Sequence, residues 1–131
     1  MKHKISLIII ILALYGCDPV KCVEYNIENN VNMDIVVNFY DSGKSVSSFQ
    51  IVSGKISTLL KNCEKGGAGL SLEFYDSIIV YNDNSPLIQY YQSSDLDNNI
   101  YKLEDNEVWI TEKIDDDLTK YTFTITEKDL K

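Results

Sequence analysis

Two-residue alternation of apolar and polar side chains is the feature of this sequence that most narrows its possible folds. In the first run, Val23, Tyr25 and Ile27 share one face, and the polar residues between them share the other. Successive side chains of a β-strand point to opposite faces of a sheet, so this period predicts half-buried strands. The pattern, or a short continuous apolar run, recurs at 33–39, 49–51, 56–60, 70–74, 78–81, 87–91, 108–114 and 121–125.

Turn-forming residues separate these runs, and no segment has the period of a long helix. Asp, Asn, Gly and Ser at 41–43 and 82–85 are examples. This pattern predicts an all-β fold of eight or nine short strands at about ten-residue spacing. An antiparallel immunoglobulin-like β-sandwich is the expected architecture, with a small β-barrel as the alternative. The expected domain spans residues 22–127, and residues 128–131 are expected to form a solvated tail.

The chain begins with basic residues, an apolar run at 5–14 and the tetrapeptide LYGC at 14–17. This order is typical of a secretory signal peptide, expected here as a helix. The tetrapeptide resembles the bacterial lipobox, although a small residue is more usual where Tyr15 stands. The resemblance implies cleavage after Gly16 and acylation of the Cys17 thiol; the alternative is an ordinary secreted protein in which Cys17 is incidental. The expected organisation is a signal peptide at 1–16 and a short tether at 17–21.

The apolar run at 5–14 also bears on how the chain meets a membrane. It is shorter than the roughly 20 residues that a helix needs to span a bilayer. A cysteine that carries several acyl chains, by contrast, anchors a protein without spanning. We therefore expect a lipid-anchored protein of the cell membrane or the outer membrane, facing the periplasm or the cell surface. Asp18 alone does not decide between the two membranes.

Composition closes off several classes of function. The chain has 12 lysines, no arginine and 20 acidic residues. Loss of Lys2 and Lys4 with the signal would leave ten lysines and a net charge of −10, which repels nucleic-acid phosphates. The one histidine, His3, would be lost as well, and with it the base of a Ser-His-Asp or Cys-His site. We expect no nucleic-acid partner, no cofactor and no enzymatic activity.

Two cysteines remain once Cys17 is assigned to the lipid. Cys22 and Cys63 form an even pair in a chain expected to reach an oxidising compartment. They could form a disulfide, or they could remain two free thiols, because Cys22 is close to the tether and could lie outside the folded core.

One loop offers oxygen ligands at alternate positions. Asp95, Asp97 and Asn99 have the spacing of a calcium loop, but Ile100 stands where an EF-hand needs glycine. Asp and Asn also gather in turns because their side chains bond the nearby backbone. We therefore expect a turn here and no metal site.

Trp109 is the candidate contact for a ligand or partner. It lies on the face opposite Val108 and Ile110. If that face is exposed, Trp109 could stack on a sugar ring or anchor a protein, and Tyr90 and Tyr91 could extend the patch. The alternative is that the aromatic side chains belong to the core of the sandwich.

Several features together resemble the small lipoproteins common in Bacteroidota. They are the lipobox, the segments IENN at 27–30 and DSIIV at 76–80, and the closing YTFTITE at 121–127. The resemblance brings no functional residues with it. From the signal, the composition and the strand pattern together, we expect a lipid-anchored, non-catalytic binding or interaction module whose membrane contact is Cys17 and whose partner is an unidentified protein or glycan. Two alternatives stay open: an acidic periplasmic inhibitor or immunity protein for a cationic enzyme, and a surface carbohydrate-binding module.

Overall fold

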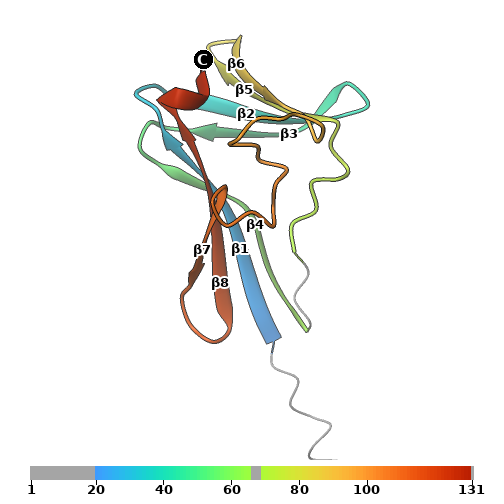
Figure 1. The fold of residues 1–131 in the computed structure, drawn as a ribbon, viewed down its shortest axis with the longest axis vertical. Coiled ribbons are helices and arrows are strands. Elements are labelled where there is room, and N and C mark those ends of the chain that lie inside the picture. The colour runs from blue at the N-terminus through green and yellow to red at the C-terminus, as the bar shows by residue number, and fades with distance from the viewer. Residues whose placement is uncertain (1–19, 66–68, 131) are drawn as a thin grey trace, which may run out of the picture.

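A computed structural model describes residues 20–65 and 69–130, which form eight strands and one short 3₁₀ helix (Figure 1). The strands lie in two four-stranded sheets that do not close into a barrel, so the expected all-β sandwich is confirmed. The expected signal helix, Gly16 and Cys17 lie outside the described residues. The elements are β1 (Val20–Asn30), β2 (Ile35–Asp41), β3 (Lys44–Ile51), β4 (Ile56–Lys65), β5 (Ser77–Asn82), β6 (Ser85–Tyr90), β7 (Trp109–Lys113), β8 (Leu118–Thr126) and η1 (Glu127–Leu130).

The strand order is β4-β1-β8-β7 in one sheet and β3-β2-β5-β6 in the other. Five of the six strand pairs are antiparallel, but β1 and β8 are parallel. The β1–β8 pair is therefore the exception to the expected antiparallel pairing. Parallel neighbours need a long connection, and here all the other strands lie between β1 and β8 in the sequence. In Figure 1, β2 and β3 run across the direction of β1 and β8.

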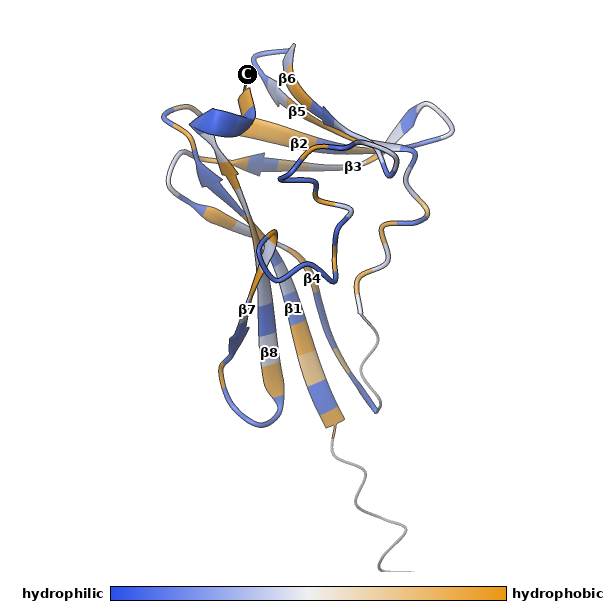
Figure 2. Cartoon of the chain, in the orientation of Figure 1, coloured by the Kyte–Doolittle hydropathy of each residue, from blue (hydrophilic) through white to orange (hydrophobic). Residues whose placement is uncertain are grey.

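Alternation along the strands builds the core. Figure 2 shows hydrophobic and hydrophilic residues alternating along β1 and β8. Ile27, Phe123 and Ile125 are fully buried in the first sheet. In the second sheet, Ile78 and Val80 are fully buried in β5, which lies between β2 and β6 as its apolar run predicts.

The turns between adjacent strands form where the sequence predicts them. Asp83 and Asn84 join β5 to β6 with φ values of 44° and 70°, and Ser42 and Gly43 join β2 to β3 with 51° and 73°. Two-residue hairpin loops need positive φ at both positions, which Asn, Asp and Gly adopt most easily. The local sequence therefore sets the register of both hairpins.

Two of the expected strands differ from the structure. No strand forms at 70–74, where Leu72 is buried and Phe74 is 75% exposed. The segment has suitable alternation, but it pairs with no strand of the described chain. In β4, a bulge opposite Tyr25 and Asn26 interrupts the alternation, so Ile56 is 58% exposed.

The two ends of the domain also differ from expectation. β1 begins at Val20, so residues 20 and 21 belong to the sheet and not to the tether. At the other end, 127–130 forms η1, and Leu130 packs against the core. The Asp129 carboxylate accepts hydrogen bonds from the Thr126 N–H and hydroxyl at 2.7 and 2.9 Å, which fixes this turn. Among the described residues, no helix has the length and hydropathy to cross a membrane.

Candidate functional site

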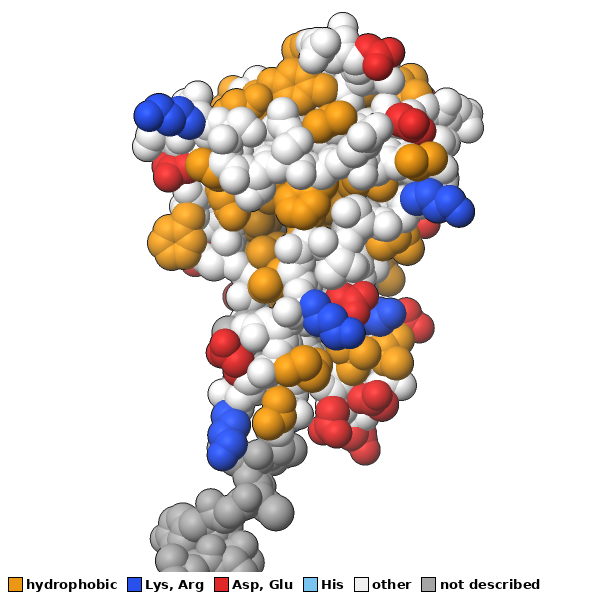
Figure 3. Space-filling view, turned by 180° about the vertical axis from the view of Figure 1, so that it is seen from behind, with side chains coloured by type: hydrophobic (Ala, Val, Ile, Leu, Met, Phe, Trp, Pro, Cys, Tyr) orange, Lys and Arg blue, Asp and Glu red, His pale blue; other side chains and the backbone are white. Residues whose placement is uncertain are grey.

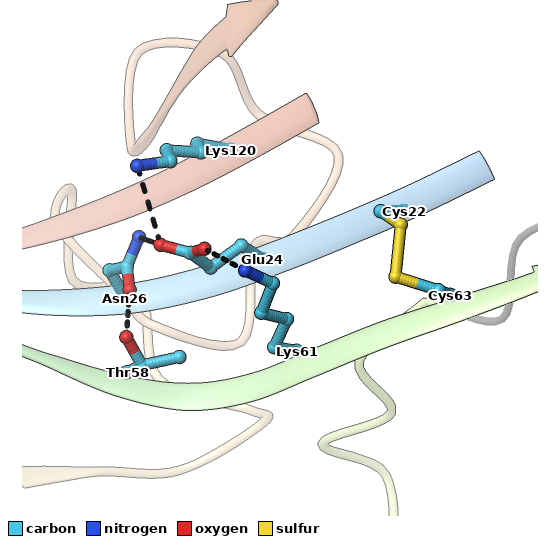
Figure 4. A network of polar contacts seen from close by, with 7 residues as sticks. All are labelled: Cys22, Glu24, Asn26, Thr58, Lys61, Cys63 and Lys120. Carbon is cyan, nitrogen blue, oxygen red and sulfur yellow. Dashed lines mark hydrogen bonds and ion pairs between the residues drawn. A yellow bond between two sulfur atoms is a disulfide. The ribbon is translucent and has the colours of Figure 1, made fainter. Parts of the chain in front are cut away.

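A disulfide joins Cys22 to Cys63 near the start of β1 (Figure 4). The two residues lie directly opposite each other in the pairing of β1 with β4. Cys22 is therefore part of the sheet, and the structure supports the disulfide over the pair of free thiols. The bond spans a sequence separation of 41 residues, at the end of the molecule where β1 starts and the antiparallel β4 finishes.

A polar network on the same sheet was not predicted from the sequence. Lys61 and Lys120 place their ammonium groups 3.7 and 3.6 Å from the Glu24 carboxylate, and the Asn26 amide donates to it at 3.2 Å (Figure 4). Thr58 donates to the Asn26 amide oxygen at 2.8 Å. Burial opposes ionisation of Glu24, but the Asn26 hydrogen bond and the charges of Lys120 and Lys61 outweigh it, so the pKa of Glu24 lies below its ordinary value.

This network joins three adjacent strands, because its members come from β4, β1 and β8. A carboxylate that accepts a hydrogen bond from an amide and lies beside two ammonium groups is stabilised in its ionised form. Glu24 is thus a poor proton donor, and its partners leave it little freedom to contact a ligand. We interpret the network as a clamp across the sheet.

Trp109 lies in the core and not on the surface. It is 1% exposed, its indole N–H donates to the Ile100 carbonyl at 2.9 Å, and its ring packs near Tyr25 and Phe123 at 5.8 and 5.5 Å. Tyr90 is also 1% exposed. The expected surface patch was therefore wrong for both residues. A sequence period shows that alternate residues face opposite ways but not which face is covered.

Tyr91 is the one member of that expected patch that reaches the surface, at 42% exposed. On β7, Ile110 is 56% exposed although its face was expected to be inward, and the residues after it in the strand are exposed as well. Val108 is buried but lies in a turn before β7, where its N–H donates to the Asp105 carbonyl. The alternation expected across 108–114 therefore does not continue from the turn into the strand.

The loop with the weak calcium candidates Asp95, Asp97 and Asn99 is held by hydrogen bonds between the Asn99 side chain and nearby backbone groups. The Asn99 amide group donates to the carbonyls of Tyr91 and Ser94, and its oxygen accepts from the N–H of Tyr101. Asn99 is buried, whereas Asp95 and Asp97 point to solvent. Within the described residues, no group of three His, Cys, Asp or Glu side chains could hold a metal ion. The Asn99 contacts support the turn interpretation.

An open hollow of about 760 Å³ lies between β6, the loop that follows it and the end of β8. Its lining includes Asp97, Asp105, Glu107 and Asp129, with two lysines. Tyr90 also lines the hollow, and its hydroxyl is buried and has no hydrogen-bond partner among the described residues. Burial, with a smaller contribution from Asp129, raises the pKa of Tyr90 well above its ordinary value. Tyr90 therefore stays neutral and is no base for catalysis.

Alkaline pH should destabilise the domain. The Tyr101 hydroxyl donates to the Tyr75 carbonyl at 2.9 Å, and burial followed by the charge of Asp76 raises the pKa of Tyr101 to about 12 from 10.0. A pKa that is higher in the folded state means that stability is fully present below pH 10 and is lost as pH rises toward 12. Burial raises the pKa of Tyr25 as well. The urea midpoint, followed by far-UV circular dichroism, should fall as pH rises from 10 toward 12 and as phenolate absorbance appears; a midpoint that does not change over this range would contradict this.

Two tyrosines meet on the outer face of the β3-β2-β5-β6 sheet. The hydroxyls of Tyr40 and Tyr81 are 2.9 Å apart, and both side chains are half-buried. Both residues fall at outward positions of their strands, but nothing in the sequence shows that they meet.

No protein-family model, curated protein or solved structure matches this chain. A proposal for its function therefore rests on the sequence and on the geometry described above.

Proposed function

We propose that the chain is a lipid-anchored lipoprotein of the bacterial cell envelope whose domain is a non-catalytic binding module. The observation that carries the proposal is the position of β1. It begins at Val20, so only residues 18 and 19 separate the sheet from Cys17. Three residues of extended chain span about 10 Å. A lipid on Cys17 would therefore hold the end of the domain where β1 begins at the membrane surface.

β1 is suited to carry such an anchor. It is an inner strand between β4 and β8, and the Cys22–Cys63 disulfide fastens it to β4 close to the expected anchor. Its 11 residues extend roughly 35 Å, so the opposite end of the sheet would lie well above the lipid headgroups. The second sheet and η1 lie toward that far end in Figure 1, where a partner would reach them.

The composition and the described polar groups support a binding role over catalysis. The chain after residue 16 has neither histidine nor arginine. Glu24 is held by Lys61, Lys120 and Asn26, and the Tyr90 hydroxyl is buried. None of these groups combines access to a ligand with a pKa near neutrality, as general acid–base catalysis requires.

Replacement of Cys17 by alanine tests the proposal. We expect this variant to lose incorporation of labelled palmitate and to move from the membrane to the soluble fraction, because the thiol that carries the lipid is gone. The matched control is the double variant Cys22→Ser with Cys63→Ser, which should still be labelled and remain with the membrane. Membrane association that is unchanged in Cys17→Ala would contradict the proposal.

A further inference from the structure

The outer face of the β3-β2-β5-β6 sheet has no charged side chain between its two ends. Ile35, Val37 and Phe39 of β2 point into the core, as do Ile78 and Val80 of β5, so the residues between them point outward. These outward positions hold tyrosines, amides, hydroxyls and aliphatic groups. The members that matter most are Asn38, Tyr40, Gln50, Ile79, Tyr81 and Gln89. An uncharged face is unexpected in a domain whose net charge would be −10.

The two tyrosines lie flat on this face. Tyr40 pairs with Ser77, whereas Tyr81 pairs with Val36, so the two tyrosines are separated by four residues along the strands, or about 13 Å. Their hydroxyls are nevertheless only 2.9 Å apart. Side chains standing upright from the sheet could not meet over that separation. Both rings must therefore lean along the surface toward each other.

The residues beneath the rings confirm this arrangement. Asn38 and Ile79 form the pair midway between the two tyrosines. The amide oxygen of Asn38 is buried and has no hydrogen-bond partner within the described residues, although the residue points away from the core. Leaning tyrosine rings explain how an outward amide becomes covered. We call the surface formed by Tyr40 and Tyr81 the tyrosine platform.

The charged side chains lie around this region. Figure 3 shows the molecule from behind, and in its upper part the acidic and basic side chains lie along the outline, whereas the middle is apolar or uncharged. Gln50 and Gln89 lie on the two edge strands of the sheet, one on each side of the platform. Their exposed amides can both donate and accept hydrogen bonds.

We propose that the tyrosine platform binds a neutral oligosaccharide, with sugar rings stacked on Tyr40 and Tyr81 and their hydroxyls bonded by the flanking amides. Aromatic faces attract the C–H groups of a sugar ring, and uncharged amides match its hydroxyls. A charged glycan would find no counter-charge on this face, and an anionic one would be repelled by the acidic domain. This inference names the ligand class of the binding role proposed above.

The size of the face favours a glycan over a protein. Four strands at about 4.8 Å spacing and six residues at about 3.3 Å give roughly 300–400 Å². A stable protein interface covers about 800 Å² on each partner. The platform is thus small for a protein but long enough for a few sugar rings.

Affinity electrophoresis of the detergent-solubilised full chain tests the inference. The gels should contain dextran, laminarin, galactomannan or xylan as neutral probes, and alginate as an anionic probe. We expect at least one neutral polymer to retard the protein and alginate not to. The double variant Tyr40→Ala with Tyr81→Ala should weaken retardation at least tenfold. Phe74→Ala removes an aromatic side chain that is 75% exposed outside this sheet, and it should change nothing.

The possible results separate this inference from the anchor. No retardation by any neutral polymer would overturn the glycan proposal, as would equal retardation of the native chain and the double tyrosine variant. Circular dichroism shows whether the double tyrosine variant is folded. If it is unfolded, Tyr81→Phe replaces it as the test: this variant keeps the aromatic ring and should retain glycan binding. If instead the native chain binds no glycan but can be crosslinked to a protein in intact envelopes, and the double tyrosine variant loses that crosslink, the face binds a protein. Palmitate labelling of Cys17 is independent of all these results.

Discussion

Replacing Trp109 by alanine should lower the free energy of unfolding by about 3–5 kcal/mol, the range found when a large buried aromatic side chain is removed. Trp109 is 1% exposed and packs near Phe123 of the adjacent strand β8 and near Tyr25 of β1, the next strand of the sheet. A domain of this size is stabilised by only about 5–15 kcal/mol in total. The variant should therefore unfold at a much lower urea concentration than the native chain.

Two matched variants separate the parts of this effect. Trp109→Phe keeps much of the apolar volume but leaves the Ile100 carbonyl without the indole N–H, which should cost about 1–3 kcal/mol. Ile110→Ala changes the next residue, which is 56% exposed, and should stay within about 0.5 kcal/mol. Urea denaturation followed by circular dichroism measures all three. If Trp109→Ala and Ile110→Ala shift the midpoint equally, Trp109 is not part of the core.

Trp109 also shows how far sequence alternation predicts this fold. The pattern predicts β1, β2, β5 and β8 because each has partners on both sides, so one of its faces is covered along its length. It predicts the wrong face at 108–114 because Val108 lies in a turn and β7 begins only at Trp109, so one alternation does not cover both residues. It predicts a strand at 70–74 that does not form. Whether a segment pairs as a strand depends on segments far away in the sequence, and the local alternation of apolar and polar residues carries no information about them.

The candidate binding surface could be predicted only in part. The alternation places Tyr40 on the outer side of its strand, and the continuous apolar run of β5 hides that Tyr81 also points outward. Their contact joins residues 41 positions apart through the pairing of β2 with β5. The Glu24 network likewise draws on three strands. By contrast, the Cys22–Cys63 pair was predictable, since counting the cysteines left few alternatives.

Removing the Cys22–Cys63 disulfide should cost about 4 kcal/mol on the loop-entropy estimate, because the bond closes a segment of 41 residues that would otherwise be free in the unfolded chain. This is comparable to the loss of Trp109, although Cys63 lies exposed and buries little apolar surface. The reason is that the disulfide acts on the unfolded state, whereas Trp109 acts through packing in the folded one. The double variant Cys22→Ser with Cys63→Ser should therefore show a lower urea midpoint.

Reduction of the native chain provides the control for this variant. A thiol reductant should shift the native midpoint to that of the double serine variant and leave the variant itself unchanged. Electrophoresis without reductant should show faster migration for the native chain, because the closed loop keeps the denatured chain compact. A native midpoint that does not respond to reduction would contradict a stabilising bond. If it does respond, β1 is fastened to β4 only five residues after Cys17, so a pull on the proposed anchor would be shared by two strands from the start.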